Sequence, residues 1–212
     1  MVAPPSETVL PIFPLPDVTF FPHTVLPLHV FEARYRAMVA DALGRDRRLA
    51  VVKLRAGWEP GYAGKPPVHA VAGAGEIVSC RRLATGRYDI VVRGDCRVAL
   101  GAEVPSDTLY RLVRARRLHD VPVSGDTVET LARVRAACGR LLAALERPAD
   151  LLDIALAPEP GLGAVADRVA AAVLPDAVLR QELLETLDVT ARLARVADAV
   201  ESLVREVTGG RE

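Results

Sequence analysis

The apolar positions of this chain change their spacing along its length. Up to about residue 118 they fall in short extended runs separated by glycine and proline, as at residues 49–54 and 88–93. From about residue 126 they recur every three or four residues, which is the spacing of one helix face. The pattern therefore predicts an α+β chain, with a β domain over residues 8–120 and an α-helical bundle over residues 124–208.

Short strands at regular intervals, separated by glycine turns, predict a small barrel or sandwich in the first half. The first strand is followed by Pro14 and Pro16. Proline has no backbone donor, so this strand should lie at a sheet edge or end quickly. Phe20 to His23 should form a turn with two aromatic residues to bury. A second turn is expected at Gly94 and Asp95. The expected strands are 9–13, 27–30, 49–54, 68–78, 88–93, 96–100 and 110–118.

Residues 31–43 carry the first helical pattern, with Phe31 on its apolar face, and Gly44 is a suitable C-terminal cap. Glu32 precedes Arg36 by four residues, the favourable order for an ion pair on a helix. The second half predicts helices with Val128 and Val178 on their apolar faces, and caps at Asp176 and Asp188. The expected helical segments are 128–145, 151–156, 162–173, 177–187 and 189–207.

Composition narrows the function. The chain has 212 residues, 50% of them apolar, a formal net charge of zero and a pI of about 6.9. A dedicated nucleic-acid binder would usually be basic, so nucleic acid is disfavoured as a partner. No apolar run is long enough to span a bilayer, and the first residues do not resemble a signal peptide. Three widely spaced cysteines are typical of buried thiols in a reducing compartment, so a cytoplasmic location is expected.

The sequence contains no motif for catalysis. There is no phosphate-binding loop of the pattern G-x-x-x-x-G-K-[ST]. Gly64-Lys65 comes nearest to it, but Glu59 occupies the position of the first glycine and Pro66 that of the serine or threonine. Neither Lys53 nor Lys65 has the setting of a serine–lysine dyad. The four histidines lack the spacing of metal ligands, and no carboxylate pair stands out. We therefore expect no metal, no cofactor and no enzymatic activity.

One stretch resembles a known family. Residues 10–15 (LPIFPL), Phe21-Pro22, residues 26–32 (LPLHVFE) and residues 34–36 (RYR) follow the opening of the N-terminal, substrate-binding domain of the Lon protease family. Residues 179–193 also resemble that family, so the likeness extends over both halves. It implies a PUA-like β pseudo-barrel with one or two helices, followed by a helical bundle. It also implies a stand-alone binding domain without the family's ATPase and protease.

The resemblance implies a partner: unfolded or apolar polypeptide segments, with a protease or chaperone as a further partner. Trp58 and Tyr62 lie on the long glycine- and proline-rich loop of residues 56–67, which is a suitable place for aromatic anchors. Glu32 and Arg36 would form a polar rim. The predicted peptide-binding residues are Phe21, Pro22, His29, Glu32, Arg36, Trp58 and Tyr62.

Two other functions remain open at this point. PUA-like barrels often bind RNA, and a basic cluster occurs at the end of the β domain, although the zero net charge favours a solvated strand face as its explanation. Its members are Arg111, Arg114, Arg116 and Arg117. Alternatively, the helical bundle could act as an adaptor or scaffold, if the apolar face of residues 189–207 were left open.

Overall fold

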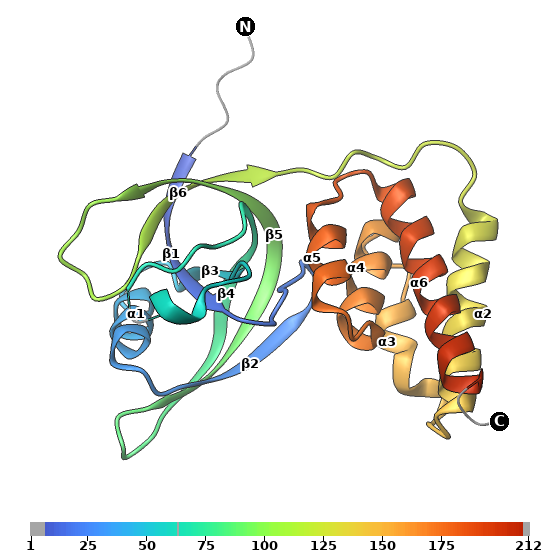
Figure 1. The fold of residues 1–212 in the computed structure, drawn as a ribbon, viewed down its shortest axis with the longest axis horizontal. Helices are drawn as coiled ribbons and strands as arrows, with labels where there is room; N and C mark the ends of the chain where they lie inside the picture. The colour runs from blue at the N-terminus through green and yellow to red at the C-terminus, as the bar shows by residue number, and fades with distance from the viewer. Residues whose placement is uncertain (1–6, 63, 210–212) are drawn as a thin grey trace, which may run out of the picture. The chain divides into compact units, whose positions relative to one another are not determined.

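The computed structural model describes residues 7–62 and 64–209. Contacts divide the chain into two units, and the division lies between His119 and Asp120. The first unit contains the β-strands and the second contains a set of helices (Figure 1). The predicted α+β fold class is confirmed.

The first unit is a six-stranded sheet that closes on itself. Its order is β2-β5-β4-β3-β1-β6, and β5 also pairs with β6, so the long and strongly curved β5 joins the two ends (Figure 1). One α-helix and one 3-10 helix accompany the sheet. The elements are β1 (Glu7–Leu15), β2 (Val25–Val30), α1 (Ala33–Leu43), β3 (Arg48–Lys53), η1 (Glu59–Gly61), β4 (Val71–Arg82), β5 (Tyr88–Val104) and β6 (Leu112–Leu118).

Strand β1 tolerates its prolines because its neighbours change along its length. Residues 7–11 pair with β6 in the antiparallel sense, whereas residues 12–15 pair with β3 in the parallel sense. The strand ends at Leu15, immediately before Pro16. The strand thus continues through Pro14 for nine residues and lies between two other strands, so the prediction of an edge strand or a quick end is wrong.

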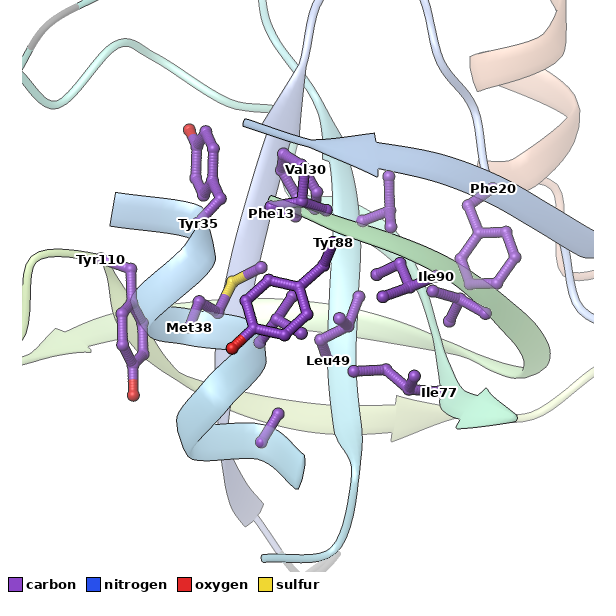
Figure 2. Packing of buried hydrophobic residues seen from close by; sticks show 14 residues of the cluster. Phe13, Phe20, Val30, Tyr35, Met38, Leu49, Ile77, Tyr88, Ile90 and Tyr110 are labelled. Atoms are coloured by element: carbon purple, nitrogen blue, oxygen red, sulfur yellow. The ribbon is translucent and has the colours of Figure 1, made fainter. Parts of the chain in front are cut away.

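Two apolar clusters fill the barrel. The larger one joins Phe13 of β1 and Met38 of α1 with Leu49 of β3 and with Tyr88 and Ile90 of β5 (Figure 2). The smaller one holds the side chains that face the other half of the barrel, where alanines at positions 50, 72, 74 and 115 let the strands pack closely. Helix α1 thus packs its apolar face against the larger cluster.

The Phe20–His23 turn packs closely against strands β4 and β5. The side chains of Phe20 and Phe21 are buried, as expected. A Cβ atom on Gly73 would lie 1.8 Å from the Phe20 carbonyl oxygen, and one on Gly94 would lie 2.3 Å from that of Phe21. These two glycines are therefore required by the close approach of the turn.

The turn predicted at Gly94 and Asp95 is wrong. Strand β5 runs through both residues, and a register shift against β4 occurs beside them. The His23 backbone N–H donates to the Gly94 carbonyl, and the Gly94 N–H donates to the Thr24 carbonyl. Asp95 is thus the extra residue of a bulge, and Gly94 beside it receives the Phe20–His23 turn.

The second unit has one long helix, α6, packed against α2 and α4. The capping carboxylates are where the sequence predicted them. Asp176 accepts hydrogen bonds from the backbone N–H groups of residues 178 and 179, and Asp188 accepts one from residue 191. The elements are α2 (Val128–Ala144), η2 (Ala149–Leu152), α3 (Asp153–Leu156), α4 (Leu162–Val173), α5 (Ala177–Glu185) and α6 (Val189–Gly209).

Two apolar residues of this unit are not where the helical pattern placed them. Val128 and Val178 are exposed, at 74% and 62% of their surface. Both stand in the first turn of their helices, ahead of the turns that pack against other helices. The periodic pattern extended the buried face one turn too far.

Candidate functional site

Three of the seven predicted site residues meet at the junction between β2 and α1. The Tyr62 hydroxyl donates a 2.6 Å hydrogen bond to the Glu32 carboxylate. Trp58 lies edge-on to the Tyr62 ring, with 5.2 Å between the ring centroids. The glycine- and proline-rich loop is therefore fastened to the start of α1 through its two aromatic residues.

Arg34 also belongs to this junction, although it is not among the predicted site residues. Its Nε donates to Glu32 over 3.0 Å, and its Nη1 donates to the Tyr62 carbonyl over 3.0 Å. The guanidinium also lies 4.6 Å from the Tyr35 ring centroid and 4.7 Å from that of Tyr62. Burial, together with the hydrogen bond to Glu32, raises the pKa of Tyr62, so its hydroxyl remains a donor at neutral pH.

The predicted ion pair between Glu32 and Arg36 is wrong. Helix α1 begins at Ala33, and Glu32 precedes it in an extended conformation, so the two side chains are not on one helical face. The Glu32 carboxylate is held by Arg34 and Tyr62 instead. The Arg36 guanidinium extends to the β4–β5 turn, where a Cβ atom on Gly86 would be 3.2 Å from its Nη1.

The same register error misplaced Phe31. The sequence pattern assigned Phe31 to the buried face of the helix, whereas the structure places it before the helix with 59% of its surface exposed. Its ring stacks on that of His29 at a centroid distance of 6.3 Å. The largest apolar side chain of the β2–α1 junction therefore faces solvent, and sequence reasoning missed it as a site residue.

His29 belongs to a polar row on the outer face of the sheet. Pairing places His29 beside Asp89 of β5, and Asp89 beside Arg81 of β4. The His29 Nδ1 lies 2.7 Å from one Asp89 carboxylate oxygen, and Arg81 donates to the other over 2.6 Å. These two hydrogen bonds hold the pKa of Asp89 below its usual value, and the one with His29 has the larger effect. The carboxylate therefore stays ionised and fixes both neighbours.

The next row inward has two apolar residues and one serine. Pro27, Val91 and Ser79 lie beside one another across β2, β5 and β4, and beyond them come Val25, Arg93 and Glu76. A surface hollow of about 510 Å³ lies over the first two rows. It is an open trough with an apolar middle and a charged end, and Phe31 stands next to that end. We call this surface, from Val25 to Phe31 with the facing residues of β4 and β5, the β2 face.

Phe21 and Pro22 do not reach any surface. Phe21 is 1% exposed, and Pro22 is buried in the same turn. Their side chains seal the barrel and cannot contact a peptide outside it in this structure. We therefore leave both out of the contact surface proposed below.

The basic cluster of the RNA alternative is partly neutralised. Arg111 is bound by Glu103, at 2.7 Å, and Arg114 lies 3.8 Å from Glu7. Arg117 donates to the backbone carbonyl of Asp95. Arg114 and Arg116 point outward from β6, as predicted, while Val113 and Ala115 are buried.

The adaptor alternative required an open apolar face on the last helix. In the structure the apolar residues of α6 at positions 189, 193, 196, 200 and 204 are buried within the helical unit. That face is therefore not free to bind another chain. The exposed apolar residues nearest to it in sequence belong to other elements, such as Ile154 of α3.

The cysteines are free thiols without activation. Cys96 and Cys138 are buried, and burial raises the pKa of each thiol to about 11. Cys80 is half-buried, and burial raises its pKa as well. A thiol is nucleophilic only as a thiolate, so these groups stay unreactive near neutral pH.

Replacing Tyr62 with phenylalanine should release the loop from α1. The change removes the hydroxyl that Glu32 accepts but keeps the ring on which Trp58 and Arg34 rest. We expect a loss of about 1 kcal/mol in the free energy of local opening, because the hydrogen bond is only partly shielded from water. Amide hydrogen exchange of the loop measures it. Unchanged exchange rates would show that the hydroxyl does not hold the loop.

The chain is a two-part domain, a closed β-sheet followed by a helical unit, and comparison with known proteins identifies its family. The sequence pattern of the ATP-dependent protease La (LON) substrate-binding domain matches residues 9–202. The chain belongs to this family, which confirms the resemblance seen in the sequence. Among bacterial relatives, it is 32% identical over 198 residues to a Lon protease of Anaeromyxobacter dehalogenans and 32% identical over 195 residues to one of Geobacter metallireducens. These matches include 90% and 89% of this chain, but only 22% and 23% of those proteins.

Solved structures agree on the fold. The N-terminal domain of Mycobacterium avium complex Lon protease superposes with a TM-score of 0.66 at 24% identity, covering 91% of this chain and 98% of that one. A Lon N-terminal domain protein from Xanthomonas campestris gives 0.65 at 18% identity, covering 90% and 98%. The likeness thus extends over both units.

No group of three or more histidine, cysteine, aspartate or glutamate side chains in residues 7–62 and 64–209 is arranged to hold a metal ion. Over the same ranges, every helix is too short or too polar to cross a membrane.

Proposed function

We propose that this chain recognises polypeptide segments that lack stable structure, and that it does so by binding alone, without catalysis. The observation that carries the proposal is Phe31, an exposed phenylalanine at the charged end of the trough on the β2 face, in a chain of the LON substrate-binding family. An unfolded chain presents apolar side chains that a folded protein hides. A shallow surface with one exposed aromatic anchor suits such a ligand.

The β2 face favours contact through side chains over the addition of a strand. β2 stands at the end of the sheet order, and its pairing is with β5. An extended peptide could in principle add to its other edge. Pro27 lies in the middle of β2 and offers no backbone donor, which weakens that edge as a template. We therefore assign recognition to Phe31, His29 and the apolar row beside them.

The junction residues act as the rim of this surface. Trp58 and Tyr62 are half-buried, and Glu32, which binds the Tyr62 hydroxyl, directly follows Phe31 in the chain. We propose that this loop fixes the position of residues 29–32 and offers the exposed part of Trp58 to the ligand. Arg36 belongs to the opposite side of the rim, at the β4–β5 turn.

Replacing Phe31 with alanine should weaken the binding of an unfolded polypeptide about tenfold, since it removes a large part of the apolar contact. Stability should change little, because the side chain is mostly exposed. The measurement is fluorescence anisotropy of a labelled protein that has been reduced and alkylated so that it cannot fold.

The matched control is Leu109, which is 68% exposed in the same unit between β5 and β6. Leu109→Ala should leave the affinity unchanged. Equal losses in the two variants would mean that binding is not located on the β2 face. If the wild-type chain does not bind the unfolded protein, the proposed function itself is wrong.

A further inference from the structure

The two units have opposite charge, although the whole chain is neutral. Residues 7–119 contain 17 lysines and arginines against 11 aspartates and glutamates, whereas residues 120–212 contain 10 against 16. The unit that carries the β2 face therefore has a formal excess of six positive charges. A basic surface attracts acidic ligands and raises their rate of encounter.

Part of this charge gathers at the end of the β4–β5 hairpin. Strand pairing sets Val30, Tyr88 and Arg82 in one row, directly after the row of His29, Asp89 and Arg81. Phe31 follows Val30, so the exposed phenylalanine lies two strands away from Arg82, at roughly 10 Å. The phenylalanine and the arginines thus belong to one end of the sheet.

The arginines at this end outnumber their acidic partners. Arg81 is bound by Asp89. Arg82 lies 6.0 Å from the Tyr88 ring centroid, and Arg87 is exposed in the turn. Within the described residues, Asp89 is the acidic side chain that contacts this group, and it is already shared between Arg81 and His29. An excess of positive charge therefore remains open to a ligand.

Arg36 adds a guanidinium with an unmet requirement. It extends from α1 to Gly86 in the same turn, and its Nε is buried without a hydrogen-bond acceptor in the part of the chain that the structure describes. The buried Nε is out of reach of a ligand, whereas the outer nitrogen atoms of a guanidinium can bind a carboxylate through two parallel hydrogen bonds. A carboxylate at the outer nitrogen atoms of Arg36 would offset this charge.

We infer that the polypeptide segments bound at Phe31 are those in which an apolar stretch is flanked by acidic residues, whose carboxylates meet Arg36 and Arg82. This inference rests on the proposed function and names its substrate class. The apolar side chains occupy the β2 face, and the acidic flank lies over the β4–β5 turn. A segment with a basic flank is rejected there by repulsion between like charges.

Three synthetic peptides with one apolar core and flanks of glutamate, serine or lysine test the inference on the full chain by fluorescence anisotropy. The glutamate-flanked peptide should bind about tenfold more tightly than the serine-flanked one, and the lysine-flanked peptide most weakly. The preference should shrink as salt is raised, because exposed charges are screened. A double variant, Arg36→Gln with Arg82→Gln, should abolish the preference, so that the glutamate-flanked and serine-flanked peptides bind with equal affinity.

The control removes the same charge from another strand, through Arg114→Gln with Arg116→Gln on β6, and should keep the preference. Equal binding of all three peptides, or a preference that survives in the Arg36/Arg82 variant, overturns the inference while the proposed function stands. Absence of binding for every peptide overturns both. If a single-stranded RNA oligonucleotide displaces the glutamate peptide and binds more tightly through Arg36 and Arg82, the surface is a nucleic-acid site and the inference is wrong.

Discussion

Replacing Arg192 with methionine is expected to destabilise the helical unit by about 3–5 kcal/mol, the usual effect of removing one partner from a buried ion pair. Arg192 of α6 is fully buried, and its Nε lies 3.1 Å from a carboxylate oxygen of Asp167, which is 1% exposed. The substitution leaves the Asp167 charge without its guanidinium partner in the interior of the unit. This is the largest single effect that the structure predicts.

The other nitrogen atoms of Arg192 explain why methionine cannot compensate by packing. Nη1 and Nη2 bind the two carboxylate oxygens of Asp120, and Nη1 also donates to the Thr186 carbonyl over 2.6 Å. One guanidinium thus joins the start of the unit, the segment before α6 and, through Asp167, helix α4. Its loss should loosen three segments at once.

Denaturant unfolding followed by the far-ultraviolet circular dichroism of the helices measures this effect. Arg195→Met is the matched control, because Arg195 lies on α6 like Arg192 and is paired with Glu182 of α5, but is 39% exposed. Exposed pairs contribute about 0–1 kcal/mol, so the control should unfold close to wild type. Similar stabilities for the two variants would show that the buried cluster does not hold the unit together.

Replacing Gly73 with alanine should destabilise the β unit by about 3 kcal/mol or more, beyond the usual range for overpacking. The new Cβ atom would meet the Phe20 carbonyl oxygen at 1.8 Å, and backbone cannot move aside as a flexible side chain can. Either the Phe20–His23 turn leaves the barrel or β4 shifts against its neighbours. Both outcomes expose the aromatic residues that seal the core.

Thermal unfolding followed by the fluorescence of Trp58, together with dye binding to exposed apolar surface, reports on this change. Gly44→Ala provides the control, since Gly44 has a negative φ of −80° and a Cβ atom there would be 3.6 Å from its nearest neighbour. That variant should remain close to wild type. A stable, dye-negative Gly73→Ala protein would contradict the close packing of the turn against β4.

The sequence predicted the features of the fold that depend on local chemistry. Asp176 and Asp188 cap their helices because a carboxylate before a helix accepts its free N–H groups, and this requires no tertiary information. It failed where a distant segment decides. Gly94 has the composition of a turn, but it lies inside β5 because the Phe20–His23 turn, over seventy residues earlier, packs against it.

The candidate site shows the same division. Trp58 and Tyr62 could be singled out because large aromatics on a glycine- and proline-rich loop are unusual. Phe31 was missed because helical spacing does not show where a helix begins. Helix α1 begins at Ala33, two residues after the start of the pattern, so Phe31 lies outside the helix and is exposed. The row of His29, Asp89 and Arg81 depends on strand register, which no local pattern in these residues specifies.

The most direct test of the account is to map, by two-dimensional NMR, which backbone amides of the ¹⁵N-labelled full chain shift when an unfolded polypeptide is added. The account predicts shifts concentrated in residues 25–36, 58–62 and 79–93, with the amides of α2 and α6 unchanged. Shifts confined to the helical unit, or an unchanged spectrum at saturating polypeptide, would contradict it.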